Sequence, residues 1–200
     1  VASWQVRSSP IVVGDRLYVG ALDGKVYCLD TSGNTKWTYT TGRPIVGSPA
    51  HYSGAVYIAS LDKNVYALDA TTGTKKWNWT TPKVVTGWTQ QFMVSSPTVA
   101  EGIVYIGAGG HSLSPTVGPV YMVALNATTG AQVWLVQTKP GTMWSQDNSN
   151  QPFAPTYFKG VLYHPAFMGV CARNAADGSL KWHQWLGHQV FSSPAYADDL

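Results

Sequence analysis

One pattern recurs along the chain: an apolar run, an Asp or Asn, a turn containing Gly, and a Trp. The clearest copy is KNVYALDATTGTKKW at Lys63–Trp77, and related copies are VYCLDTSGNTKW at Val26–Trp37 and YMVALNATTGAQVW at Tyr121–Trp134. A fourth and looser copy closes on Trp182. Repetition at this period is typical of folds in which small similar units pack against one another.

Each copy begins with a small residue followed by Pro. These pairs, together with a fifth near the end of the chain, are Ser9-Pro10, Ser48-Pro49, Ser96-Pro97, Ala154-Pro155 and Ser193-Pro194. Successive prolines are separated by 39, 48, 58 and 39 residues, so the third copy carries an insertion. The spacing predicts repeats over approximately residues 8–46, 47–94, 95–152 and 153–191, with partial blades at both ends.

Within the first copy, four segments rich in β-branched and aromatic residues are separated by turn-forming residues. The segments are PIVV, RLYVGAL, KVYCLDT and TKWTYTT, and the breaks are Gly14-Asp15, Asp23-Gly24 and Ser32-Gly33-Asn34. Asp-Gly between strand-like runs favours a hairpin, because the tight turn needs positive φ. Four antiparallel strands in about 40 residues make one propeller blade. We therefore predict an all-β propeller with about four complete blades, belonging to a larger propeller.

The closing tryptophans are predicted to be structural. A single blade cannot bury both of its faces, so each blade needs a neighbour. A Trp on the fourth strand offers a large flat contact for the next blade. The four docking residues predicted in this way are Trp37, Trp77, Trp134 and Trp182.

The composition of the chain favours one cellular location and argues against nucleic-acid binding, a membrane span and a cysteine metal site. Only 12% of the residues are charged, against roughly 25% in an average soluble domain, which favours an extracytoplasmic location: periplasmic, secreted or cell-surface. The net charge of +3 comes from scattered Lys and Arg, so no basic stripe for nucleic acid exists. No apolar run approaches the roughly 18 residues of a membrane span. Cys28 and Cys171 lack metal or haem spacing and are predicted to be buried thiols.

The repeated motif resembles the tryptophan-docking motif of pyrroloquinoline quinone (PQQ)-like β-propellers. Ala67–Trp77 matches it, Ala124–Trp134 matches with Asn126 in place of Asp, Ala172–Trp182 matches more loosely, and Cys28–Trp37 is one residue short. The resemblance implies a larger parent propeller, of eight blades in the quinoprotein relatives. Because that family includes both quinoprotein alcohol dehydrogenases and non-catalytic proteins of outer-membrane assembly, the resemblance leaves the function open.

The third repeat resembles the cofactor region of the dehydrogenases. In that family this region supplies a calcium-ligand Asn and an Asp proposed as the base that takes the alcohol proton. Here the Asn position falls on Gly110 and the Asp position on Ser145, with Asp147 and Asn148 just beyond. The resemblance implies Asp147 as a candidate catalytic base, Trp144 and Gly110 as cofactor-binding positions, and Asn148 as a candidate calcium ligand.

These residue types suit that chemistry. Calcium prefers oxygen ligands and polarises a quinone carbonyl, while a carboxylate beside the substrate hydroxyl acts as general base. The loop SQDNSN also fits a solvated connection between blades, and the adjacent Cys pair of the dehydrogenases is absent. Two hypotheses remain: an extracytoplasmic, non-catalytic scaffold or binding module, and a quinoprotein dehydrogenase that oxidises an alcohol or sugar with PQQ and calcium.

Further candidates lie outside the repeat motif. Asn78 and Asn126 each begin an Asn-x-Thr glycosylation sequon, and the dispersed histidines predict no metal site. Aromatic residues in the connecting segments form either a surface for a protein or carbohydrate partner or additional packing. They are Trp79, Trp88, Phe92, Trp144, Trp185 and Phe191. The remaining blades of the same propeller are the other expected partner.

Overall fold

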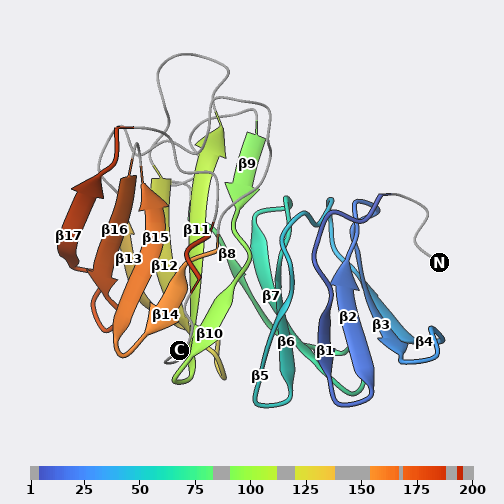
Figure 1. The fold of residues 1–200 in the computed structure, drawn as a ribbon. Coiled ribbons are helices and arrows are strands. Elements are labelled where there is room, and N and C mark those ends of the chain that lie inside the picture. Colours follow the sequence, from blue (N-terminus) through green and yellow to red (C-terminus); the bar gives the residue numbers. More distant parts are fainter. Residues whose placement is uncertain are drawn as a thin grey trace.

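The computed structural model describes residues 5–82, 91–111, 120–137, 154–166, 169–187 and 193–195. The regular structure of these residues is entirely β-strand, arranged as four antiparallel sheets that stand side by side (Figure 1). Each sheet contains a path of four strands in which strands consecutive in sequence are neighbours in space. This architecture confirms the predicted all-β, bladed fold, here as part of a propeller.

The first two sheets have four strands each. The first contains β1 (Ile11–Val13), β2 (Arg16–Gly20), β3 (Lys25–Asp30) and β4 (Thr35–Thr40). The second contains β5 (Ala50–Tyr52), β6 (Ala55–Ala59), β7 (Asn64–Asp69) and β8 (Lys75–Thr80). In the first sheet the turns fall at the predicted breaks, where Gly14, Gly24 and Gly33 have positive φ.

The third and fourth sheets repeat this order. The third contains β10 (Thr98–Ala100), β11 (Ile103–His111), β12 (Val120–Asn126) and β13 (Gln132–Gln137). The fourth contains β14 (Thr156–Phe158), β15 (Val161–Ala166), β16 (Gly169–Asn174) and β17 (Leu180–Trp185). In each of the four sheets, the ladder between the third and fourth strands has a register shift at the same place, two residues before the Asp or Asn of the motif.

The third sheet carries an additional strand, β9 (Gln91–Val94). β9 pairs with the end of β11, from Ala108 opposite Val94 to His111 opposite Gln91. β11 is nine residues long and extends past β10, so its far end presents unpaired backbone groups that β9 satisfies. β9 falls in the range 47–94 predicted for the second repeat, yet it joins the sheet of the third.

Apolar residues form one buried cluster between each pair of neighbouring sheets. Tyr18 and Ile58 belong to the cluster between the first and second sheets, and Tyr57 and Val123 to the cluster between the second and third. Tyr105 and Leu162 belong to the cluster between the third and fourth. The core is therefore divided into three inter-blade junctions, called the first, second and third junction below.

The two ends of the sheets differ. At one end, called the docking end, lie the turns that join the third and fourth strands of each sheet. At the other end, called the loop end, lie the β2–β3 and β6–β7 turns and the start of the segment that passes from the first sheet to the second, where Thr41 and Gly42 bond to these turns. The loop end is at the top in Figure 1.

Candidate functional site

Each junction is built around one tryptophan and one backbone carbonyl. Trp37 Nε1 donates a hydrogen bond of 3.1 Å to the carbonyl oxygen of Ala70 in the next sheet. Trp77 donates in the same way to Ala127 (2.9 Å), and Trp134 to Ala175 (2.9 Å). The indole therefore combines buried ring area with a satisfied N–H group, which makes the contact both strong and directional.

The glycine of the motif makes room for that indole. Gly73 has a φ of +73°, and a Cβ atom placed on it would lie 2.6 Å from Trp37 Cδ2. Gly130 stands in the same relation to Trp77, at 2.7 Å. Only glycine satisfies both the left-handed backbone and the close approach of the ring.

The Asp of the motif holds the loop that carries the accepting carbonyl. Asp69 Oδ1 accepts hydrogen bonds from the backbone N–H groups of Thr71 and Thr72, each 3.0 Å. The pKa of Asp69 falls to about 2, and the hydrogen bond from the Thr72 N–H group is the largest cause. The hydrogen bond from the Lys76 ammonium is the next largest cause that lowers it. Asn126 Oδ1 accepts equivalent bonds in the third sheet, so a neutral amide oxygen serves the same purpose.

A tyrosine supports the tryptophan at the first two junctions. Tyr18 donates its hydroxyl proton to the Ala70 carbonyl that Trp37 also uses, and Tyr57 does so to Ala127, both at 3.0 Å. The third junction differs. There the ring of Tyr105 stacks on Tyr157 of the next sheet, with centroids 6.1 Å apart and planes 11° apart.

Trp182 has a different environment, because no further sheet follows the fourth among the described residues. Its side chain is 45% exposed, although the centroid of its ring still lies 5.9 Å from that of Tyr163.

A serine before the repeated proline also bonds the backbone of the preceding repeat. Ser193 Oγ accepts a 3.0 Å hydrogen bond from Ala154 N, 39 residues earlier. Ser48 Oγ accepts the equivalent bond from Ser9 N across the first junction.

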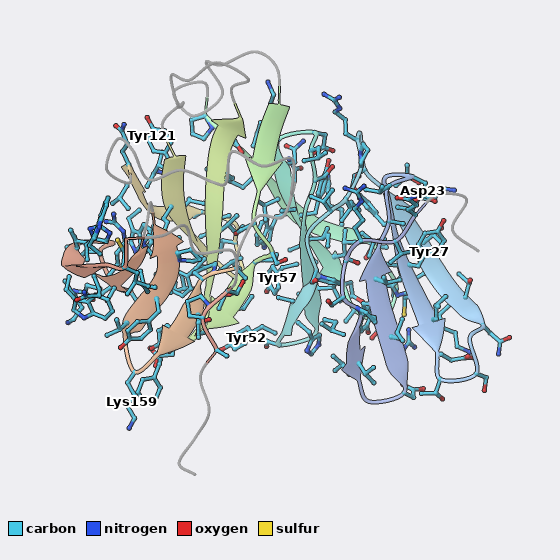
Figure 2. All side chains as sticks on the ribbon, turned by 45° about the horizontal axis from the view of Figure 1, so that its top comes forward. Asp23, Tyr27, Tyr52, Tyr57, Tyr121 and Lys159 are labelled. Carbon is cyan, nitrogen blue, oxygen red and sulfur yellow. The ribbon has the colours of Figure 1, made fainter. Side chains whose placement is uncertain are left out.

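At the loop end of the first two sheets, the carboxylates of Asp23 and Asp62 accept hydrogen bonds from neighbouring groups. Asp23 Oδ2 accepts a 2.5 Å hydrogen bond from the Tyr27 hydroxyl, and Figure 2 shows the two side chains together. This bond is the main reason that the pKa of Tyr27 rises to about 12. Asp62 Oδ2 accepts from the Tyr66 hydroxyl (2.6 Å) and from Gly42 N (2.7 Å). Both carboxylates therefore fix turns and crossovers.

A buried pair of basic side chains lies in the fourth sheet. Arg173 Nε donates to His164 Nε2 at 3.2 Å, which requires His164 Nδ1 to carry the ring proton and donate to the Pro165 carbonyl (2.9 Å). Burial, reinforced by the charge of Arg173, lowers the pKa of His164 to about 4. Arg173 Nη1 also donates to the carbonyl of Gly178, next to the third junction. Sequence reasoning did not identify this pair.

The structure reaches only part of the predicted cofactor region. Asp147, Trp144 and Asn148 lie outside the described residues. Gly110 lies in β11, with its backbone opposite Phe92 of β9. Within the described ranges, no group of three His, Cys, Asp or Glu side chains is placed to hold a metal ion.

The remaining sequence candidates have varied surroundings. Asn78 is exposed on β8, whereas Asn126 is half-buried in the docking loop described above. Three of the aromatics predicted in connecting segments lie in strands instead: Trp79 in β8, Phe92 in β9 and Trp185 in β17. Trp79 packs against the core of the second junction and Trp185 is exposed. Cys28 and Cys171 are buried, and no disulfide joins them. No helix within the described ranges is long and apolar enough to cross a membrane.

Four sheets joined by tryptophan–carbonyl contacts define a β-propeller of tryptophan-docked blades. The family model described as outer membrane protein assembly factor BamB, a PQQ-type repeat model, matches residues 2–113 and 118–200. The chain belongs to this family. No curated protein sequence matches it.

Solved propellers share the fold at low sequence identity. Quinohemoprotein alcohol dehydrogenase from Comamonas testosteroni superposes with a TM-score of 0.72 at 23% identity, covering 91% of this chain and 35% of its own. The enzyme ADHIIG from Pseudomonas putida HK5 gives 0.71 and 22%, covering 91% and 34%. BamB from Moraxella catarrhalis gives 0.68 and 19%, covering 91% and 54%. The chain thus spans between about a third and about half of the length of these proteins.

Proposed function

We propose that this propeller segment belongs to an extracytoplasmic, non-catalytic scaffold or binding protein. The observation that carries the proposal is the state of the carboxylates at the loop end. Asp23 and Asp62 are the carboxylates that the described residues place there, and each accepts from a tyrosine hydroxyl and a backbone N–H group. A carboxylate held in this way stabilises a turn and is not placed to accept a proton from a substrate.

The position expected to supply a calcium ligand supports the same conclusion. Calcium needs six to eight oxygen ligands, drawn from carboxylates, amides, carbonyls and water. Gly110 contributes no side chain, and its backbone lies opposite Phe92 in the ladder between β9 and β11. The described part of the loop end therefore does not fit a calcium–quinone site.

The family match also supports a binding role and an extracytoplasmic location. The matching model is described as an outer membrane protein assembly factor. The low content of charged residues is consistent with that setting. We infer that the loop end, where β17 ends on the exposed Trp185, is where a protein or carbohydrate partner binds.

The competing proposal is a quinoprotein dehydrogenase acting on an alcohol or sugar. It is favoured by the order of elements in the third repeat: a Gly-rich strand end, an insertion, the docking motif, and a loop with Trp144, Asp147 and Asn148. In that case Asp147 takes the alcohol proton and Asn148 binds calcium. Replacing Asp147 with Asn then abolishes dye-linked turnover.

The deciding experiment uses the native, full-length protein purified from a host that makes PQQ. The protein is denatured, small molecules are extracted, and PQQ is measured by mass spectrometry together with bound calcium. We expect neither quinone nor calcium in stoichiometric amount. One equivalent of quinone with calcium would overturn the scaffold proposal and make Asp147→Asn the next variant to assay.

A further inference from the structure

Strand register identifies equivalent positions at the three junctions. Arg16 pairs with Val13 at the end of the β1–β2 ladder, and Ile103 pairs with Ala100 at the end of the β10–β11 ladder. The two residues therefore occupy the same place, one in the first sheet and one in the third. Ala55 occupies this place in the second sheet.

Arg16 fills the docking end of the first junction. Its Nη1 donates a 2.9 Å hydrogen bond across the junction to the carbonyl oxygen of Thr71, which follows the docking carbonyl of Ala70. Its Nε lies 4.0 Å from the carboxylate of Asp15, in the turn just before β2. The guanidinium group is thus held chiefly by the Thr71 carbonyl, with Cys28 Sγ 4.0 Å from Nη1 and the exposed Asp15 carboxylate at the outer limit of an ion pair.

The third junction has a cavity at the corresponding place. Ile103 replaces Arg16, and Ala176 occupies the register of Thr71. The cavity measures about 240 Å³, and its lining includes Glu101, Ile103, Tyr105, Tyr157, Asn174 and Ala176. Ile103 is too short and too apolar to supply the charge that Arg16 brings to the first junction.

The walls of the cavity suit a planar cation. The rings of Tyr105 and Tyr157 stack there, and aromatic faces attract cations. Glu101, an exposed carboxylate, lies in the turn between β10 and β11 at the register of Gly14, one residue before the position that Asp15 takes in the turn between β1 and β2. A hydrogen bond with Glu101 is the largest cause that raises the pKa of Tyr157, which places this carboxylate beside the ring.

The basic side chains of the described residues do not neutralise Glu101. Their salt bridges involve Asp15, Asp30 and Asp69. Lys159, labelled in Figure 2, belongs to the β14–β15 turn, and its ammonium lies over the ring of Phe158, 4.8 Å from the centroid. Among the described residues the Glu101 carboxylate therefore accepts a hydrogen bond from the Tyr157 hydroxyl and forms no ion pair, which leaves its other lone pairs for an external cation at the edge of the cavity.

We propose that the third junction binds a small molecule with a guanidinium group, seated as the Arg16 guanidinium is seated at the first junction. The planar fork donates to the backbone beside Ala176 and to Glu101, and the carbon chain packs against Ile103. The second junction lacks both the carboxylate and the larger apolar side chain, because Ser53 stands at the position of Glu101 and Ala55 at the position of Ile103. The site lies at the docking end and does not depend on the function proposed for the loop end.

The test measures binding of ethylguanidinium to the full chain by NMR titration at low millimolar concentrations, below the denaturing range. We expect saturable shifts confined to the third junction. Ile103→Arg supplies the missing guanidinium from within and abolishes binding. The matched control is Val161→Arg, at the same register of the fourth sheet and facing no further described sheet; it leaves binding unchanged.

A second variant keeps the test informative if Ile103→Arg does not fold. Glu101 is exposed, so Glu101→Gln preserves the fold and weakens binding about fivefold through loss of the ion pair. Absence of saturable shifts, or binding that neither variant alters, would overturn the proposal. Equal binding of ethylammonium would overturn the guanidinium assignment. Binding of capped arginine amide without binding of ethylguanidinium would overturn the small-molecule assignment in favour of an arginine side chain of a partner.

Discussion

Trp134 and Trp182 have the same position in successive sheets but different surroundings. Each pairs across its ladder with an alanine, and each has a tyrosine ring about 6 Å away, 6.0 Å from Trp134 and 5.9 Å from Trp182. Yet Trp134 is 9% exposed and Trp182 is 45% exposed. The difference comes from the docking loop of the following sheet, which covers Trp134. The burial of a docking tryptophan is thus a property of the neighbouring blade.

The docking loops show the same contrast between a covered and an uncovered position. A Cβ atom on Gly73 would collide with the Trp37 ring, whereas one on Gly33 would meet nothing within 4 Å. Gly33 belongs to the docking loop of the first sheet, and no earlier tryptophan lies against it among the described residues. The described segment therefore has a tryptophan open at one end and an open docking loop at the other.

The largest expected effect separates the docked tryptophan from the open one. Trp37→Ala removes a buried ring and its hydrogen bond to Ala70, so it should lower the free energy of unfolding by about 3–5 kcal/mol. Trp182→Ala should cost about half as much, because nearly half of that side chain is already exposed. Urea unfolding of the two variants and the parent measures both values. Equal losses would contradict the role assigned to the neighbouring loop.

Alanine substitutions of the docking-loop glycines distinguish the cost of backbone strain from the cost of a clash with the tryptophan ring. Gly33→Ala and Gly73→Ala both place a side chain at positive φ, +85° and +73°, which costs about 1–2 kcal/mol. Only Gly73→Ala also pushes against a tryptophan ring, which should add about 1–3 kcal/mol. Thermal unfolding of the pair checks the difference. If the two variants lose the same stability, the close approach to Trp37 has no energetic weight.

The next prediction concerns pH and the third junction. The pKa of His164 is about 4 in the folded chain, against about 6.5 when unfolded, so the unfolded state binds more protons between these values. The stability contributed by the neutral imidazole is complete above pH 6.5 and is lost as pH falls toward 4. We expect a loss of about 2 kcal/mol between pH 7 and pH 5.

Urea unfolding of the parent and of His164→Gln at several pH values tests this dependence. The glutamine carbonyl accepts from Arg173 without titrating, so the variant should show a flatter profile. Asp69 has a folded pKa of about 2, so the stability that it contributes is lost only at lower pH than this window. An unchanged slope in the variant would assign the pH dependence to another group.

The smallest effect on stability is expected from glycosylation, which compares a docking loop with an outer strand. Asn126 uses its side-chain oxygen to hold the docking loop, whereas Asn78 is exposed on β8 and bonds Lys75 and Asn64. Expression through a eukaryotic secretory pathway should therefore modify Asn78 and leave Asn126 bare. Peptide mass spectrometry measures the occupancy of each. Modification of Asn126 would show that its docking loop opens before folding is complete.

Much of the fold follows from local patterns. Short runs of β-branched and aromatic residues separated by Asp-Gly and Gly-Asn turns predict the strands of the first sheet to within a few residues. The equivalence of Asp69 and Asn126 can also be predicted from the sequence, because both side chains provide an oxygen at the same position of the motif. For the cofactor region, Asp147, Trp144 and Asn148 remain predictions.

What the sequence by itself determined is the repeat, the size of each blade and the residues that recur in it. Only the tertiary structure decided which atoms meet: that Trp37 binds the carbonyl of Ala70, that β9 joins the third sheet, and that Arg16 fills a junction where Ile103 leaves a cavity. The physical reason is that strand and turn preferences are local, whereas the junctions depend on contacts between residues 33 to 70 positions apart. A repeated motif shows that blades pack; the side chains of two different blades together decide what the space between them holds.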